Sequence, residues 1–268
     1  MPELPEVQTV VNGLQKLVGQ KITKIITRFP RLRYPLNSKE LNQCSGHIIQ
    51  KIERRAKYII ITTEAGNLIC HLGMSGKITI YETPPEITKH DHVDIVTEHF
   101  TVRYNDPRRF GCVIFSDDIT KLEMLNTLGP EPLTDIFTGK YLFEQIKSRK
   151  TTIKQLIMDN AIVVGVGNIY ACESLFLSHI SPLRTGNQLK LKECEKLVSN
   201  IKEVLQHAIA LGGSSLRDYR NADGDLGYFQ QNHFVYGHSN KPCKICNSII
   251  QEIRLGQRNS FYCPTCQK

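Results

Sequence analysis

The sequence lacks the long apolar segments and leader patterns that mark membrane and secreted proteins. No stretch approaches the roughly 20 consecutive apolar residues that a membrane-spanning helix needs, so no membrane partner is expected. Glu3 and Glu6 stand where a secretory signal would carry basic and then apolar residues. Internal repeats and low-complexity segments are missing as well. These absences predict a cytoplasmic globular protein.

Cysteine is too sparse for a small disulfide scaffold. The chain has nine cysteines, an odd number, in 268 residues. We expect the scattered cysteines, most of which have apolar neighbours, to be buried reduced thiols. They are Cys44, Cys70, Cys112, Cys172 and Cys194. The other four cluster near the C-terminus and have a different meaning.

The composition is that of a globular protein with a basic excess. Hydrophobic residues make up 40% and charged residues 22%, which permits a sizeable core, and the length predicts two domains. The net charge is +8 and the isoelectric point about 9.0. Such an excess suits a polyanionic partner such as nucleic acid, because phosphate neutralisation releases counterions. Charge alone is equally compatible with a basic soluble protein.

The first part of the chain predicts one helix followed by a β domain. Residues 3–18 carry apolar side chains at helical spacing, and Gly19 ends the pattern. Short β-rich runs separated by glycine and proline follow, and they favour a β-sandwich or barrel. These runs are Ile22–Thr27, Ile48–Glu53, Tyr58–Thr62, Asn67–His71, Ile78–Tyr81, His92–Val96, Thr101–Tyr104 and Cys112–Phe115. Residues 2–116 are therefore predicted to form the first domain.

The second part predicts helices and a small cysteine module. Residues 117–133, which end near Gly129-Pro130-Glu131-Pro132, are interpreted as a linker. Residues 134–230 are predicted to form a helical domain, and residues 231–268 the cysteine module. The helices are expected at about 139–148, 151–158, 168–178 and 188–211. Residues 213–228 show no periodicity, and a loop of this length in a compact domain is usually functional or mobile.

Four cysteines have the spacing of a zinc ribbon. In Cys243-x2-Cys246-x16-Cys263-x2-Cys266, each Cys-x-x-Cys pair can present two thiolates from one turn. Four thiolates close the coordination sphere, so one Zn²⁺ would be structural rather than catalytic. Apolar residues between the pairs fit two strands of a hairpin. Its central segment, 254–259, reads Arg-Leu-Gly-Gln-Arg-Asn, a basic and amide-rich tip that suits phosphate or groove contact.

Several turns carry residues suited to nucleic acid. Gly165 and Gly167 precede a predicted helix for which Asn168 is a good N-cap residue, and such a helix start can bind an anion. Lys57 is expected at a hairpin tip. Met74 lies between glycines in a turn, and Arg108, Arg109 and Phe110 occupy another. Apolar residues exposed in turns could insert between bases; otherwise they fold inward.

Taken together, these segments resemble the formamidopyrimidine-DNA glycosylase family over essentially the whole chain. The matching segments are MPELPEV at 1–7, RRAKY at 54–58, HLGMSG at 71–76, KHDHVD at 89–94, DPRRFG at 106–111, LGPEPL at 128–133, VGVGNIYA at 164–171, GYF at 227–229, VYG at 235–237 and the terminal ribbon. The resemblance implies an α+β fold: an N-terminal helix and β-sandwich, then a helix–two-turn–helix domain with a C-terminal four-cysteine zinc ribbon. The related endonuclease VIII branch typically begins Pro-Glu-Gly-Pro, whereas Leu4 and Pro5 stand here.

The resemblance also implies roles for individual residues. Pro2, after removal of Met1, would be the nucleophile, Glu3 the general acid, and Lys57 and Arg258 phosphate-binding residues that assist the chemistry. DNA would be contacted by His90, Met74, Arg108, Arg109, Phe110, Lys154, Asn168 and Tyr236. Within that set, Met74, Arg108 and Phe110 would fill the void left by a flipped nucleotide. The loop around Ser214–Tyr219 would cover the extruded base.

The implied activity is that of a monomeric, nucleoid-associated bacterial enzyme of base excision repair. It would excise oxidised purines from damaged double-stranded DNA and then cleave the strand, with no small-molecule cofactor. The chemistry suits the residues, because an N-terminal amine has a reference pKa of about 7.7–8.0 and is partly neutral at physiological pH. Two alternatives stay open: an endonuclease VIII-like enzyme for oxidised pyrimidines, and a zinc-ribbon DNA-binding protein without catalysis.

Overall fold

A computed structural model describes residues 2–214 and 233–268 of the chain. The chain divides into two compact units. Unit 1 comprises Met1–Asn126 and Leu211–Tyr228, and unit 2 comprises Thr127–Ala210 and Phe229–Lys268. The division at Asn126 lies inside the segment interpreted as a linker. Of the predicted loop 213–228, all but the first two residues lie outside the described part of the chain.

Unit 1 begins with helix α1, Leu4–Leu14, which continues as the short 3-10 turn η1, Gln15–Leu17. Its first turn is stabilised by Glu6, whose Oε2 accepts a hydrogen bond of 2.7 Å from the N–H of Glu3. The apolar side chains at helical spacing are buried from Leu4 to Leu17, as the sequence predicts, whereas Val18 is 40% exposed. Gly19 follows with a φ of +89°, a conformation that ends the helical segment at little steric cost.

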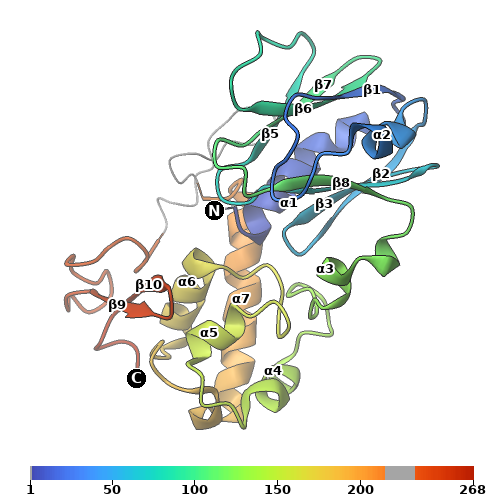
Figure 1. Ribbon diagram of the computed structural model, residues 1–268. Helices are drawn as coiled ribbons and strands as arrows, with labels where there is room; N and C mark the ends of the chain where they lie inside the picture. Colours follow the sequence, from blue (N-terminus) through green and yellow to red (C-terminus); the bar gives the residue numbers. More distant parts are fainter. Residues whose placement is uncertain (1, 215–232) are drawn as a thin grey trace. The chain divides into compact units, whose positions relative to one another are not determined.

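Two four-stranded antiparallel sheets form the body of unit 1 (Figure 1). The first has the order β1-β6-β7-β5 and the second the order β2-β3-β4-β8. The strands are β1 Ile22–Thr27, β2 Ile49–Arg55, β3 Tyr58–Thr63, β4 Gly66–His71, β5 Lys77–Tyr81, β6 Asp91–Thr97, β7 Thr101–Asn105 and β8 Cys112–Ser116. Each agrees with a β-rich run predicted from the sequence to within two residues at either end. Because the sheets bury apolar side chains in one common cluster, the predicted β-sandwich is confirmed.

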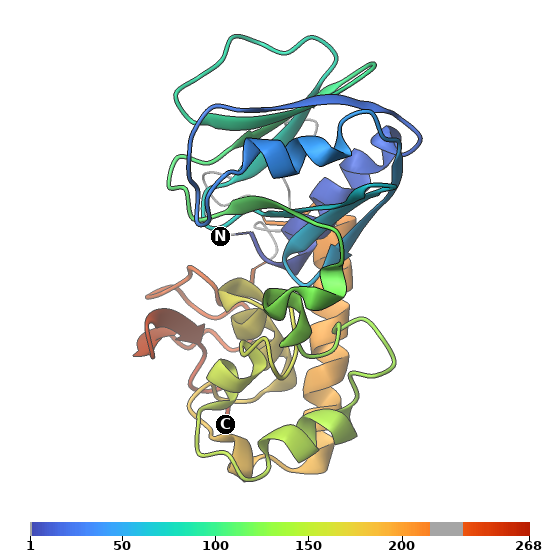
Figure 2. The same cartoon turned by 45° about the vertical axis from the view of Figure 1, so that its right-hand side comes forward.

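Short helices that the sequence did not predict complete unit 1. Helix α2, Ser38–Leu41, contacts β1 and β8, which are edge strands of different sheets, and Figure 2 shows it in blue beside the sandwich. The 3-10 turns η2, Asn42–Cys44, and η3, Ile119–Lys121, and helix α3, Glu123–Asn126, are equally short. Helix α1 packs against β2 and β3. These contacts place the N-terminal residues beside the β2–β3 hairpin.

Unit 2 is helical and ends in a hairpin. Its helices are α4 Gly139–Ile146, α5 Ile153–Ile157, α6 Asn168–Ser178 and α7 Leu191–Ala210, with the 3-10 turn η4, Gly186–Gln188, before α7. Helix α7, drawn in orange in Figure 1, packs against α4 and α6. Strands β9, Gln251–Leu255, and β10, Arg258–Tyr262, form the hairpin, and β10 contacts α6. The predicted α+β architecture is thereby confirmed.

The five scattered cysteines are all buried and none forms a disulfide. Within residues 2–214 and 233–268, no helix is both long enough and apolar enough to cross a bilayer.

Candidate active site and DNA interface

The N-terminal residues are fixed by buried carboxylates. Pro2 is buried and precedes Glu3, the N-cap residue of α1, and Glu3 and Glu6 are 3% and 2% exposed. Glu6 accepts from Glu3 through Oε2 and from the N–H of Ser214 through Oε1, at 2.7 and 2.8 Å. Glu6 is therefore a structural carboxylate that fixes the start of the chain. The prediction that Pro2 and Glu3 are catalytic is untested by this geometry.

Lys57 occupies the two-residue turn between β2 and β3, as predicted for a hairpin tip. Ala56, the other turn residue, has a φ of +53°. Arg54 ties this turn to the beginning of α1, because its guanidinium donates to Gln8 Oε1 at 2.9 Å and to the carbonyl of Ala56 at 3.0 Å. A half-buried cation is thus held on a turn that is joined to the helix following Pro2.

Two further turns of unit 1 present apolar side chains to solvent. Met74 is 39% exposed and Phe110 50% exposed, so neither folds inward. Arg108 is exposed with its guanidinium over the Phe110 ring, at 5.1 Å from the centroid. The guanidinium of Arg109 lies over Phe29 at 4.5 Å, and Arg109 has a φ of +56°. These exposed apolar and basic groups have the chemistry of a wedge that enters a base stack.

His90 is half-buried directly before β6, with its ring centroid 6.5 Å from that of His92. Its binding to DNA stays a prediction. His71, at the end of β4, has its pKa lowered to about 4 by burial and by the nearby cations of Arg33 and Lys57. Its neutral ring accepts a hydrogen bond from the N–H of Gly73 through Nδ1 at 3.0 Å, which shapes the turn that bears Met74.

In unit 2, Lys154 and Asn168 share a network with strand β10. The ammonium of Lys154, which is 1% exposed, donates to Asn168 Oδ1 at 2.6 Å and to Ser260 Oγ at 2.5 Å. It also donates to the carbonyl of Asn259 at 3.2 Å, and Asn168 Nδ2 donates to the same carbonyl at 3.0 Å. Lys154 thus positions Asn168 and the strand that begins at Arg258.

The N-cap assignment for Asn168 is wrong. The cap residue of α6 is Gly167, and Asn168 is the first helical residue. Its side chain bonds to Lys154 and Asn259 instead of to the amides of its own helix.

The tip of the ribbon hairpin is shorter than the sequence indicated. Strand β9 runs to Leu255 and β10 begins at Arg258, so only Gly256 and Gln257 form the turn. Gly256 has a φ of +60°, which a type II′ turn requires at its first central residue. Arg258 is exposed and pairs in register with Leu255. A basic side chain is therefore displayed from a regular strand next to a tight turn.

Tyr236 is held by a carboxylate that the sequence did not single out. Glu173 on α6 is 2% exposed and accepts hydrogen bonds from three successive N–H groups, those of Phe234, Val235 and Tyr236, at 2.8, 3.1 and 2.8 Å. Burial raises the pKa of Glu173, an effect that these hydrogen bonds oppose. An acidic residue inside an otherwise apolar helix face is the signal that could have revealed it.

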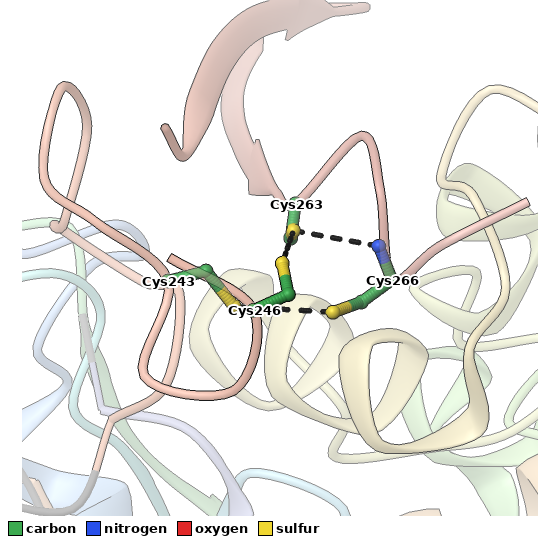
Figure 3. A group of neighbouring side chains, drawn as sticks. All are labelled: Cys243, Cys246, Cys263 and Cys266. Atoms are coloured by element: carbon green, nitrogen blue, oxygen red, sulfur yellow. Dashed lines mark hydrogen bonds between the residues drawn. The ribbon is translucent and has the colours of Figure 1, made fainter. Parts of the chain in front are cut away.

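The four cysteines of the ribbon converge on one point (Figure 3). Their sulfurs all lie within 4.8 Å of one another, with Cys243 and Cys266 3.9 Å apart and Cys246 and Cys263 3.4 Å apart. Four sulfurs that each lie about 2.3 Å from one ion are about 3.8 Å from one another, whereas the two sulfurs of a disulfide are only about 2.05 Å apart. Backbone N–H groups of Ile245 and Cys266 point at Cys243 and Cys263. The residues therefore fit one tetrahedrally bound structural metal ion.

Three family sequence models match the chain in order. They describe the formamidopyrimidine-DNA glycosylase N-terminal domain at residues 1–113, the formamidopyrimidine-DNA glycosylase H2TH domain at 128–220, and a zinc finger found in FPG and IleRS at 240–268. This combination is that of the helix–two-turn–helix DNA glycosylases.

Relatives that match over the whole chain show which family within this class the protein belongs to. A formamidopyrimidine-DNA glycosylase of Glaesserella parasuis serovar 5 is 50% identical over 272 residues, which cover 100% of this chain and 99% of that protein. A Lactococcus lactis FPG variant, solved with DNA that contains Fapy-dG, has a TM-score of 0.91 at 36% identity, with 100% of both chains covered. MutM, solved with DNA that contains carbocyclic 8-oxo-G, has a TM-score of 0.90 at 36% identity, again with 100% of both chains covered. The chain belongs to the formamidopyrimidine-DNA glycosylase family.

Proposed function

We propose that this protein is a bifunctional DNA glycosylase and AP lyase that excises 8-oxoguanine and formamidopyrimidines from duplex DNA. The observation that carries the proposal is the chain start, where Pro2 precedes a buried Glu3 and α1 is tied through Arg54 to the turn that bears Lys57. The relatives solved with Fapy-dG and 8-oxo-G DNA support oxidised purines as the substrate class. The enzyme acts as a monomer in base excision repair.

Pro2 supplies the nucleophile once Met1 has been removed. Its neutral secondary amine attacks C1′ of the damaged nucleotide, the base departs, and the resulting iminium carries a positive charge without a labile N–H. That iminium acidifies the neighbouring sugar protons, and β,δ-elimination then releases both flanking phosphates. A lysine side chain, with a reference pKa near about 10.4, would need a much larger perturbation to be neutral.

Glu3 acts as the general acid and proton shuttle. Its carboxyl group adjoins Pro2 in sequence and is buried at the cap of α1, where it can protonate the ring oxygen and open the sugar. Lys57 binds a phosphate near the lesion. Glu6 accepts a hydrogen bond from the N–H of Glu3 and takes no direct part in the chemistry.

The remaining side chains offset the cost of extruding the base, which is about a few kcal/mol. Met74, Arg108 and Phe110 fill the vacated space, with Arg108 facing the estranged cytosine, and Arg109 and His90 contact the adjoining backbone. Asn168, Arg258 and Tyr236 bind phosphates beside the flipped nucleotide. Lys154 assists them through the hydrogen bonds that fix Asn168 and β10. A damaged pair opens more easily, which contributes to selectivity.

Zinc is the proposed metal of the ribbon. Cys243, Cys246, Cys263 and Cys266 would hold it with four thiolates, and the bound ion would supply folding energy to the hairpin. The hairpin in turn displays Arg258.

Excision assays on matched duplexes test the substrate class. We expect release of 8-oxoguanine opposite cytosine to exceed release of thymine glycol; the opposite preference would indicate the endonuclease VIII branch.

Borohydride reduction during turnover distinguishes an enzyme from a lesion-binding protein, because only a Schiff-base intermediate is trapped as a covalent protein–DNA adduct.

A further inference from the structure

The turn that bears Met74 and the turn that bears Arg108 and Phe110 are packed backbone against backbone. A Cβ on Gly73 would lie 2.5 Å from the amide nitrogen of Gly111 and from the carbonyl carbon of Phe110. A Cβ on Gly111 would lie 2.2 Å from the carbonyl oxygen of His71. Both glycines are therefore required by close approach, and neither turn can shift without the other.

One buried carboxylate joins the two turns. Asp106 is 0% exposed, and its Oδ1 accepts a hydrogen bond of 2.7 Å from the hydroxyl of Ser75, the residue after Met74. Its Oδ2 accepts from the N–H of Gly111 at 2.9 Å, and Oδ1 accepts from the N–H of Arg108 at 3.2 Å. The same Arg108 N–H also points to Ser75 Oγ at 3.1 Å. The carboxylate thus contacts the residues that adjoin each exposed apolar side chain.

The backbone of Asp106 is fixed by His90 and His92, which lie next to and within β6. Its N–H donates to the carbonyl of His90 at 3.0 Å, and its carbonyl accepts from Nε2 of the buried His92 at 2.9 Å. The ring of His92 lies 5.5 Å from that of Phe29, and Phe29 in turn carries the guanidinium of Arg109. These contacts fix the backbone of Asp106, so its carboxylate cannot shift together with the Met74 turn or with the turn that bears Arg108 and Phe110.

We propose that Asp106 is a positioning residue that holds Met74, Arg108 and Phe110 as one preassembled wedge. This inference rests on the proposed function, in which those three side chains enter the base stack. A wedge that is already assembled inserts in one step. The two turns that carry its side chains are already ordered, so they lose little further backbone entropy on binding DNA. Ser75 transmits the placement from Asp106 to the Met74 turn.

Stopped-flow fluorescence of the full-length protein tests the proposal. The probe is a duplex with 8-oxoguanine opposite cytosine and 2-aminopurine beside that cytosine, whose emission changes when side chains displace the stacked bases. The variants are D106N, S75A, M74A and the double variant D106N/M74A. D94N is the matched control, because Asp94 is also a buried carboxylate of unit 1 but binds Arg103 and Arg28 instead of the turns.

We expect D106N to slow insertion about tenfold and S75A about threefold, as loss of buried hydrogen bonds predicts. In the M74A background, D106N should slow insertion by about threefold rather than tenfold, because one of the three side chains that Asp106 positions is already gone. D94N should lower the melting temperature and leave the insertion rate of the wild type. If D106N does not fold, S75A and S75A/M74A carry the same comparison.

Two results would overturn the proposal. One is insertion at the wild-type rate in folded D106N, or in S75A where that variant replaces it. The other is a slowing that multiplies with that of M74A, which is the signature of independent destabilisation. Excision of 8-oxoguanine by the wild type is measured in parallel. Its absence would contradict the proposed function, whereas normal excision with unaffected variants contradicts the role of Asp106 alone.

Discussion

The ammonium of Lys154 and the amide of Asn168 are joined by a hydrogen bond of 2.6 Å between α5 and the first residue of α6. The same ammonium reaches Ser260, and Asn168 reaches the carbonyl of Asn259, both on β10. A single buried lysine therefore fixes a helix start relative to the strand that begins at Arg258. Its charge is directed inward to oxygen acceptors of the protein.

Replacing Lys154 with methionine keeps the chain length and removes the donor. Three acceptors around it would each lose a hydrogen bond, so we expect unit 2 to lose about 2–4 kcal/mol of stability. Affinity for duplex DNA should fall as well, because Asn168 keeps only its hydrogen bond to the carbonyl of Asn259. Thermal unfolding and fluorescence anisotropy measure the two effects. Lys202→Met, which removes a more exposed lysine bonded to one carbonyl, is the control and should change both by little.

Arg258→Ala should weaken binding to damaged and undamaged DNA alike. A phosphate contact carries no base information, and the loss of one contact should reduce the dependence of log K on log salt by about one. Titrations at several salt concentrations measure this. Lys192→Ala, which removes an exposed charge on α7, is the charge-matched comparison. A loss of affinity confined to the lesion duplex would assign Arg258 to base readout.

Cys246→Ser should release the metal and abolish DNA binding while unit 1 stays folded. Three thiolates cannot close a tetrahedral site, and the hairpin depends on that site for its folding. Metal analysis of the purified variant should show loss of one zinc per chain. Cys194→Ser, at a buried thiol of α7 outside the ribbon, should retain it. An unchanged zinc content in Cys246→Ser would remove the ribbon from the account.

Acid should destabilise unit 1 through His71. Its pKa is lowered from 6.5 to about 4, mainly by burial, so the folded state keeps the ring neutral while the unfolded chain takes up a proton. Stability contributed in this way is present above about pH 6.5 and is lost as the pH falls toward 4, by on the order of 2–3 kcal/mol. His71→Asn should flatten the unfolding free energy over that interval. His99→Asn, at an exposed position, should leave the slope unchanged.

The regular elements could be predicted because burial imposes a period on them. The strands of the sandwich and the apolar stripes of α1 and α7 follow from alternation and helical spacing. Helices α2 and α3 could not be found in this way, since four residues are too few to show a period. Spacing alone likewise identified the four-cysteine ribbon.

Side-chain partners far apart in sequence could not be predicted. Asn168 was expected to cap its own helix, but Lys154, 14 residues earlier, and Asn259, 91 residues later, compete for its amide. The burial of Lys154 arises from that same long-range contact. Asp106 opens the segment DPRRFG, and an Asp before such a turn is a known signal for local hydrogen bonding. Its bond to Ser75, 31 residues away, required the fold.

The role of Pro2 is tested most directly by mapping the adduct that borohydride traps on 8-oxoguanine DNA. Peptide mass analysis should find the cross-link on a peptide that begins at Pro2 and lacks Met1, and Pro2→Gly should cleave the strand more slowly without loss of folding. A cross-link at Lys57 or another lysine, or wild-type cleavage by a protein that keeps Met1, would contradict an attack by the imino nitrogen of Pro2.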